Sequence, residues 1–516
     1  RRPGAQIPVG NESFDLDRLS WASPRRAMPS LIAFPDRWRL AEAVGLVPVH
    51  WWDPYNQNTL KGDRPIFGND WFLVAGLVSD TLVEPRRLPT PVGNQATGQP
   101  GQLDVFGNGD QLFFNQNVIV SLSLIEGDTT FRPPDWEFRV STVASLNYLD
   151  VNEPGVVNAN PDKGTTRFDQ HVGIQELYVD RHLRNKSENY DFDSLRVGIQ
   201  PFITDFRGFL FFDNQPGVRL FGNWFANRLQ YNLAAFWRLE KDTNSGLNTV
   251  FDTRDDQVFA ADVFLQDFLL RGFTGEALVA YNRNREGDRN PHYDNNGFLQ
   301  RPAPVGIERP HNYDVVYPGI GGDGHLGRIN LTSNMFLALG HDDLNSIARQ
   351  STTIFAYLMA AEASIDVDWM RYKLYAYHAS GDSNPTDGTA KGFDAIFENP
   401  NFAGAGTSFW VRQGLPFIGG GGVTLKDRSS LLPALQSSKL QGQSNFVNPG
   451  LTLAGVGADF DVLPELRLLS NASWLGFDQT EVMQTLRQQR SVAHDIGYDL
   501  SIGAIYRPLF TENPVF

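Results

Sequence analysis

The sequence predicts an all-β protein, a transmembrane antiparallel barrel of about 16–18 strands with long extracellular loops. First, many stretches of about 10–15 residues alternate between apolar and polar side chains, which is the period of a β-strand. Second, aromatic residues are abundant, with 37 Phe and 11 Trp, although only 41% of all residues are hydrophobic. Third, no stretch approaches the roughly 18–20 consecutive apolar residues that a membrane-spanning helix needs.

Composition excludes several other classes of protein. The chain has 44 Lys and Arg against 59 Asp and Glu, a net charge of −15. This balance argues against nucleic-acid binding, which relies on Lys and Arg neutralising phosphates. Cysteine is absent, so the chain supplies no disulfide, thiolate metal site, iron–sulfur cluster or covalent haem attachment. We therefore expect no cofactor.

The alternation is clearest in four segments: 137–149, 228–240, 328–340 and 495–507. In the first, Phe138 begins an apolar face and Glu137 begins a polar one. In the second, Ala234 and Phe236 are apolar exceptions on the polar face. Such a pattern predicts strands with one face in an apolar environment and the other in a polar one.

Segment length favours a membrane barrel over a soluble all-β protein, which is the alternative. Soluble strands average about 5–6 residues, whereas a tilted membrane strand needs about 9–11. Aromatic residues also lie near the ends of several apolar faces, at Tyr148, Trp237, Tyr498 and Tyr506. Aromatic girdles at the two membrane interfaces have this placement. No internal repeat of about 20–50 residues indicates a propeller or solenoid.

About fifteen segments read as strands: 71–84, 111–125, 135–149, 169–182, 192–203, 216–223, 227–240, 257–271, 275–286, 326–340, 351–365, 367–380, 449–462, 465–478 and 495–508. The connections tend to alternate between long and short, as extracellular loops and periplasmic turns do. This alternation fails around 204–215 and 341–366, so we expect a miscounted strand near each. Barrels of this kind usually have an even number of strands. We expect either that the closing strand lies beyond the sequence or that Phe516 is the terminal aromatic residue of an unusually short one.

The first 66 residues do not alternate and form a separate lead-in segment before a barrel over 67–516. Residues 35–45 read as a short capped helix, and a turn-rich aromatic stretch follows at 50–58. The lead-in is too short for the plug of a large transporter. It fits either a partial plug or a strap at the rim of the barrel.

The polar faces of the strands predict the residues that line a solute path. Nine are basic: Arg139, Arg196, Arg228, Arg238, Arg328, Arg371, Lys373, Arg467 and Arg507. Five are acidic: Glu137, Glu240, Glu465, Asp495 and Asp499. An excess of Arg on the inner wall predicts a preference for anions. The equally weighted alternative is that these bases pair with acids across strands and stiffen the wall.

Catalytic and metal-binding signals are weak. The nucleophile-elbow, zinc-protease, Walker A and EF-hand motifs are missing. His341 with Asp342 and Asp343 puts a histidine beside carboxylates, but an ordinary turn explains the group better. Neither His378 nor Ser380 has a base or oxyanion donor that the sequence pairs with it. We expect no enzyme activity and no metal.

The four clearest segments together resemble Gram-negative outer-membrane β-barrels of the porin or carbohydrate-exporter kind. This resemblance implies a location in the outer membrane, contact with lipid and lipopolysaccharide, and either a homo-oligomer or a second outer-membrane or periplasmic protein as partner. It also implies a channel, here for small polar or anionic solutes. The alternative is a barrel that encloses or anchors another protein, such as a multihaem cytochrome.

The longest predicted loop, 381–448, bears on this choice. It contains four consecutive glycines at 419–422 and apolar clusters at 409–411 and 415–418. These clusters suit either a loop folded into the barrel as an eyelet or a surface loop packed on its neighbours. An inward loop favours the channel, because a sheath needs a wide bore.

Overall fold

The computed structural model describes residues 58–87 apart from 69, 108–127, 133–187, 191–404 and 438–507, together with 414–416, 422–424 and 435. The chain divides into two compact units, one of residues 1–73 with 515 and the other of residues 74–514 with 516. The predicted helix at 35–45 and the apolar cluster at 409–411 lie outside the described residues.

Antiparallel strands make up most of the second unit. After β1 (Lys61–Phe67), the long strands are β2 (Trp71–Arg87), β3 (Asp110–Glu126), β4 (Trp136–Val151), β5 (Thr166–Asn185), β6 (Phe192–Ile203), β7 (Phe212–Trp224), β8 (Leu229–Lys241), β9 (Asn248–Leu265), β10 (Phe273–Arg285), β13 (Asn312–Leu326), β14 (Ile329–Asp342), β15 (Thr352–Val367), β16 (Met370–Ala379), β20 (Leu451–Leu463), β21 (Leu466–Gly476) and β22 (Asp495–Tyr506). The connections hold short elements: η1 (Pro161–Lys163), β11 (His292–Tyr293), β12 (Leu299–Arg301), β17 (Thr389–Ala390), β18 (Gly414–Pro416), β19 (Gly422–Thr424) and α3 (Glu481–Arg487).

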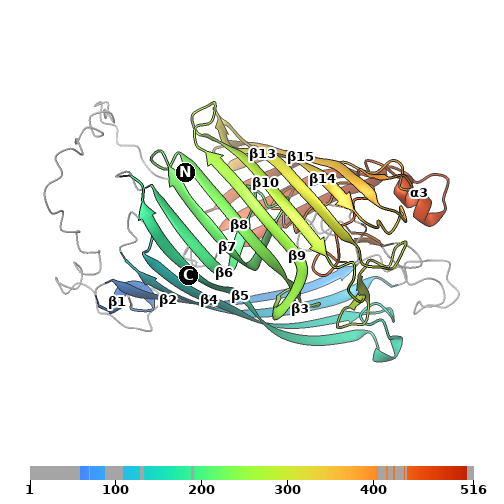
Figure 1. The fold of residues 1–516 in the computed structure, drawn as a ribbon, viewed down its shortest axis with the longest axis horizontal. Helices are drawn as coiled ribbons and strands as arrows, with labels where there is room; N and C mark the ends of the chain where they lie inside the picture. The colour runs from blue at the N-terminus through green and yellow to red at the C-terminus, as the bar shows by residue number, and fades with distance from the viewer. Residues whose placement is uncertain are drawn as a thin grey trace. The chain divides into compact units, whose positions relative to one another are not determined.

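The long strands from β2 to β22 form one meander in which each pairs with the next along the chain (Figure 1). β16 pairs with β20 in full register, from Met370 opposite Phe460 to Ala379 opposite Leu451, although a long connection separates them. With β1 and the two-residue β17, the sheet has 18 strands. No pairing in the described residues joins β22 to β2. The predicted fold class is confirmed.

One strand escaped the sequence analysis. β13 (Asn312–Leu326) lies largely inside the stretch 287–325 that we expected to be a loop. Glycines interrupt its apolar face, and Gly319 is one that packing requires, because a Cβ there would lie 2.5 Å from the Phe336 ring. No additional strand lies at 204–215 or 341–366, because residues 204–211 and 343–351 are loop and the rest of each stretch belongs to β7, β14 or β15. With β13 included, long and short connections alternate along most of the meander, except that the β8–β9 and β9–β10 connections are of nearly equal length.

Burial on the strands is the reverse of that in a water-soluble protein. On β4, the polar side chains of Ser141, Ser145 and Asn147 are buried, whereas Phe138 and Leu146 are 40% and 41% exposed. β3, β8 and β14 likewise expose large apolar side chains on one face. Within the described part of the chain, no helix is long and apolar enough to cross a membrane. The sheet thus presents an apolar outer face and encloses a mostly polar inner one.

Candidate functional site

Two connections fold against the inner face of the sheet, and we call them the inner loops. They comprise residues 204–211, between β6 and β7, and the described parts of the β16–β20 connection, residues 380–404 and 438–450. The two run side by side, because the backbone N–H groups of Ile396 and Phe397 both donate to the Leu210 carbonyl at 3.1 Å. The N–H of Phe212 donates to the Phe397 carbonyl at 2.9 Å.

An apolar core fixes the inner loops to the wall. Phe236, one of the two apolar exceptions on the polar face of β8, lies with its ring centroid 5.9 Å from Phe211 and 5.0 Å from Phe202. On the other side of this core, Tyr317 packs edge-on against Phe393, with centroids 6.1 Å apart. The described residues of the long loop therefore fold inward, which was one of the two alternatives for this loop.

A buried ion-pair network forms a second anchor. Arg254 on β9 binds Glu286, with Nη2 2.8 Å from Oε2, and also donates to the Gly442 carbonyl at 2.9 Å. Arg301 lies with its Nε 3.2 Å from Oε1 of the same glutamate and donates to the Gln441 carbonyl at 2.8 Å. Both arginines thus tie the wall to the backbone of the inner loop. Glu240, predicted to line the path, is instead buried and paired with Arg301.

Within the inner loops, two acids share one buried base. Lys439 contacts both Asp394 and Glu398, the latter at 3.0 Å, and all three side chains are buried. Burial raises the pKa of Asp394 above its usual range, Lys439 opposes this rise and Glu398 adds to it. The Asp394 carboxylate also accepts a hydrogen bond from the Asn445 N–H at 2.9 Å. This group joins residues from both described parts of the long loop.

Four of the predicted bases lie on the inner face, and each pairs with an acid on the neighbouring strand: Arg139 with Glu176, Arg196 with Asp180, Arg238 with Asp256 and Lys373 with Asp459. In the best-defined case, Arg196 lies directly opposite Asp180 in the β5–β6 register and 2.7 Å from it. Glu137 is close to the same group, 4.0 Å from Arg196, and accepts from Ser123 at 2.7 Å. These contacts are the cross-strand ladder that the sequence left open as an alternative.

The other predicted bases lie near the ends of strands. Arg371 and Arg467 each pair with an acid of their own hairpin, Asp366 at 2.6 Å and Asp461 respectively. Arg228 and Arg328 are exposed in the short turns before β8 and β14, and Arg507 is exposed just after β22. The placement of Arg228 and Arg328 within strands was therefore wrong. The acids Glu465 and Asp495 also lie at strand boundaries, whereas Asp499 is buried on β22.

The inner faces of β3 and β4 carry mainly uncharged polar side chains. Gln111, Asn115, Asn117 and Ser121 on β3 are half-buried. Ser145 on β4 donates to the Asn115 side-chain oxygen at 3.2 Å. We call this the polar wall, residues 111, 115, 117, 121 and 145. Its hydroxyl and amide groups can exchange hydrogen bonds with a polar solute.

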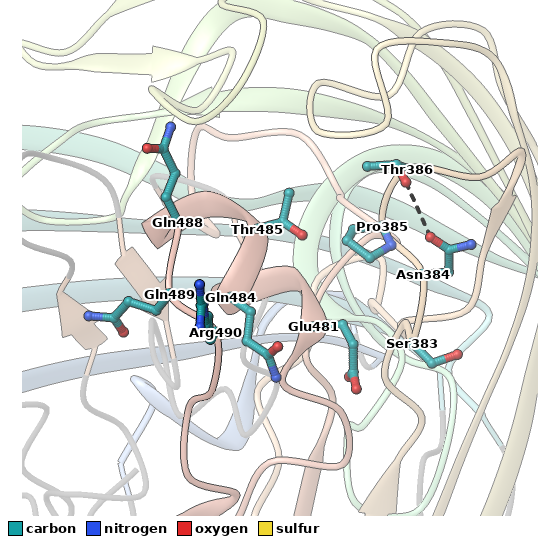
Figure 2. Close-up of a pocket in the computed structure, with 10 residues that line it drawn as sticks. All are labelled: Ser383, Asn384, Pro385, Thr386, Glu481, Gln484, Thr485, Gln488, Gln489 and Arg490. Carbon is teal, nitrogen blue, oxygen red and sulfur yellow. Dashed lines mark hydrogen bonds between the residues drawn. The ribbon is translucent and has the colours of Figure 1, made fainter.

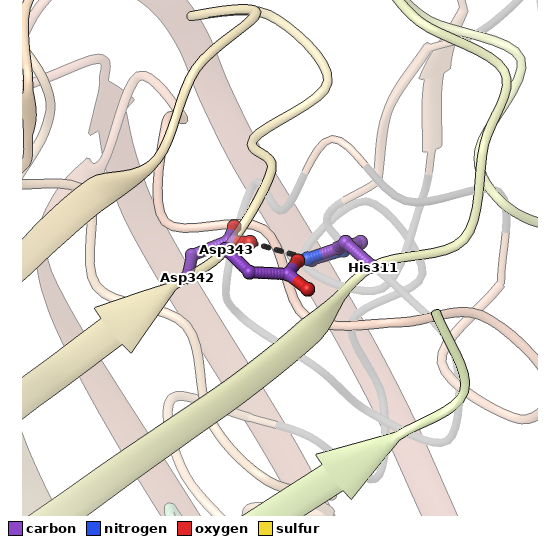
Figure 3. Close-up of side chains that lie close together, drawn as sticks. All are labelled: His311, Asp342 and Asp343. Atoms are coloured by element: carbon purple, nitrogen blue, oxygen red, sulfur yellow. Dashed lines mark hydrogen bonds and ion pairs between the residues drawn. The ribbon is translucent and has the colours of Figure 1, made fainter. Parts of the chain in front are cut away.

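His311, just before β13, lies near Asp342 and Asp343 at the end of β14 (Figure 3). The Nδ1 atom of His311 is 2.7 Å from an Asp342 oxygen, and Asp343 accepts two hydrogen bonds from Asn312 at 2.8 Å. The backbone of His311 also exchanges hydrogen bonds with the Gln443 side chain. Because the carboxylates already have N–H partners, the group is explained as an anchor of the inner loop, and we assign no metal to it.

The histidines that the sequence analysis considered have other surroundings. His341 lies 3.2 Å from the Ser351 hydroxyl and does not join Asp342 and Asp343 in the cluster. Nδ1 of His378 is 2.9 Å from the Thr452 hydroxyl, while Ser380 donates to the Lys391 carbonyl at 2.7 Å. Ser380 and His378 are thus not paired with each other as nucleophile and base.

A pocket of about 470 Å³ lies between the 383–386 loop and α3 (Figure 2). Its lining is mostly uncharged and polar, with Thr386 donating to Asn384 at 3.2 Å and Gln484 and Gln488 on the facing side. Glu481 and Arg490 supply one charge of each sign. The polar wall, rather than this peripheral pocket, is our candidate for a solute path.

No protein-family model and no curated protein matches the sequence. Several solved outer-membrane proteins share a likeness in structure. OmpF of Salmonella typhi is 9% identical with a TM-score of 0.36, over 84% of this chain and 97% of that one. OccK9 of Pseudomonas aeruginosa is 11% identical with a TM-score of 0.41, over 84% and 98%. The siderophore receptor PiuA of Acinetobacter baumannii is 7% identical with a TM-score of 0.38, over 85% and 62%. At these values no ligand or activity carries over to this chain.

Proposed function

We propose that this chain is a β-barrel channel of a Gram-negative outer membrane, which passes small polar solutes along the polar wall beside the inner loops. The observation that carries this proposal is the reversed burial of the strands, with exposed Phe138 and Leu146 alternating with buried Ser145 and Asn147. A sheet with an apolar outer face and a polar inner face suits a cylinder in lipid. Lipid and lipopolysaccharide would then cover the outer face.

The ion pairs of the inner wall bear on charge preference. Arg139, Arg196, Arg238 and Lys373 each have an acidic neighbour, which offsets much of the field that each base would exert on a passing anion. This supports uncharged polar solutes, such as sugars, over acidic ones. Preference for anions remains the alternative proposal, and a reversal potential distinguishes the two.

The inner loops favour a channel over a sheath around another protein. Leu210, Phe211 and Phe397 are buried against the wall, so part of the enclosed space is already occupied by the chain itself. A sheath for a folded partner needs that space free. We therefore propose no cytochrome or other enclosed protein.

Swelling of proteoliposomes in isotonic sugar solutions tests the proposal. Asn117→Trp places a large side chain on the polar wall and should narrow the solute path beside it. Val118→Trp makes the same change at the adjacent residue, on the outer face. We expect the wild type and Val118→Trp to admit small sugars and Asn117→Trp to admit them more slowly. Equal rates for the two variants, or no swelling by folded wild-type protein, would contradict the proposed path.

A further inference from the structure

Three strands bring together a buried carboxylate and a buried carboxamide on the inner wall. Glu276 on β10 lies directly opposite Gly321 on β13, which in turn lies opposite Asn334 on β14. Glu276 is 5% exposed and Asn334 is 4% exposed. Gly321 has no side chain, so the two polar groups face each other across it.

Neither side chain has its hydrogen-bonding capacity met by the described residues. Both carboxylate oxygens of Glu276 and both amide atoms of Asn334 are buried without a close hydrogen-bond partner among them, although the backbone N–H of Phe206 in the inner loop lies near Glu276. A Cβ on Gly321 would lie 2.7 Å from Nδ2 of Asn334 and 2.8 Å from Oε2 of Glu276. Leaving such groups unpaired is destabilising, and more so for a charge, so an additional partner at this position would stabilise the wall.

Two further acidic residues lie near Glu276. Asp262 on β9 lies diagonally across from Glu276 in the register, and its Oδ2 atom is also buried without a partner among the described residues. Asp205, in the inner loop, is a further acidic neighbour, and the N–H groups of residues 207–210 bind its carboxylate. In the described residues, no ion pair to a Lys or Arg is formed by Glu276 or Asp262.

We propose that Glu276 and Asn334 form a binding site for a hard cation of the Ca²⁺ type on the inner wall, with Asp262 as a nearby acid. Calcium takes six to eight oxygen ligands at about 2.3–2.6 Å from carboxylates, amide oxygens and water. Glu276 supplies carboxylate oxygens, rotation of the Asn334 amide by half a turn presents its oxygen, and water would complete the ligands. The cation offsets the acidic charges, and the missing side chain at Gly321 leaves room for it.

Isothermal titration calorimetry of the whole protein in detergent, with calcium as the titrant, tests this site. We expect one saturable site in the wild type and at least tenfold weaker binding in Glu276→Gln, which removes a charge but keeps the shape. Gly321→Ala keeps every ligand but puts a methyl group among them, so it should weaken binding as well. Glu308→Gln makes the same chemical change at an exposed loop residue and should bind like the wild type.

Any of three results would overturn the proposed calcium site. Absence of saturable binding, or unchanged affinity in Glu276→Gln, means that Glu276 is a neutral, protonated acid in the wall. Equal weakening in Glu276→Gln and Glu308→Gln means that calcium binds only diffusely to surface acids. The titration needs no transport activity, so its outcome is independent of the proposed channel.

Discussion

Arg254 donates two hydrogen bonds to Glu286, from Nε to Oε1 at 3.1 Å and from Nη2 to Oε2 at 2.8 Å, with both side chains fully buried. The same Nη2 atom donates to the carbonyl of Gly442 in the inner loop. The pair thus couples the wall to the segment that occupies part of the interior. A buried, doubly bonded pair of this kind is costly to break, because removal of Arg254 leaves the buried Glu286 carboxylate with Arg301 as its remaining basic partner.

Arg254→Met is expected to destabilise the protein by about 3–5 kcal/mol and to loosen the inner loop. Loosening should raise the single-channel conductance and expose the 380–450 connection to protease. Arg289→Met, which removes an exposed base paired with Asp255, is the matched control and should leave conductance unchanged. Equal conductance in the two variants would show that the inner loop does not limit passage.

The raised pKa of Asp394 predicts that this residue makes stability depend on pH. In the unfolded chain this carboxyl titrates in its ordinary range, whereas in the folded chain burial keeps it protonated to higher pH. The folded state therefore binds more protons between these values, so the contribution of Asp394 to stability grows as pH falls from 7 toward 4 and is lost as pH rises. The difference in unfolding temperature between wild type and Asp394→Asn should therefore change across this window, and it should be smallest at its acidic end.

The exposed Asp288 serves as the control for that titration, because Asp288→Asn changes an acid outside the inner loops. Its unfolding temperature should follow the wild-type dependence on pH. A wild-type dependence that survives unchanged in Asp394→Asn would exclude the buried Lys439 group as its source.

Charge substitutions distinguish inner-wall bases from those in turns. Arg139→Gln leaves Glu176 without its partner on the inner face, so it should shift the reversal potential in a salt gradient toward cation selectivity. Arg228→Gln removes the same charge from an exposed turn and should have little effect. A larger shift from Arg228 would mean that the turns, and not the wall, set the selectivity.

An arginine on the outer face tests contact with lipid. Leu233→Arg alters a half-exposed residue in the middle of β8, and near the bilayer midplane this costs about 2–4 kcal/mol. Leu269→Arg alters an even more exposed leucine in the β9–β10 turn, and in water such a change costs at most about 0.5 kcal/mol. Unfolding from lipid vesicles measures both. Similar small effects would mean that β8 faces water.

Much of the fold follows from local periodicity, because the side chains of a strand alternate whatever its partners are. β4 and β8 were predicted almost to their ends on this basis. β13 was missed because Gly319 and Gly321 stand where apolar or polar side chains would have continued the pattern. Their small size serves packing across strands, which a single sequence does not show.

The arrangement of the inner wall depends on contacts between segments that are distant in the chain. Such contacts are poorly predicted from a single sequence. The pairing of Ile396 with Leu210 joins two connections far apart in the chain. One signal was available: Ala234 and Phe236 interrupt the polar face of β8 where the inner loops pack. Similarly, Arg196 could be placed on a polar face, but its pairing with Asp180 depends on the register of β5 and β6.

Single-channel recording of the purified protein in a planar bilayer tests the central claim most directly. We expect stable openings of small conductance, with a reversal potential near zero in a salt gradient because the wall charges are paired. Silent bilayers from protein that is shown spectroscopically to be folded would contradict a channel.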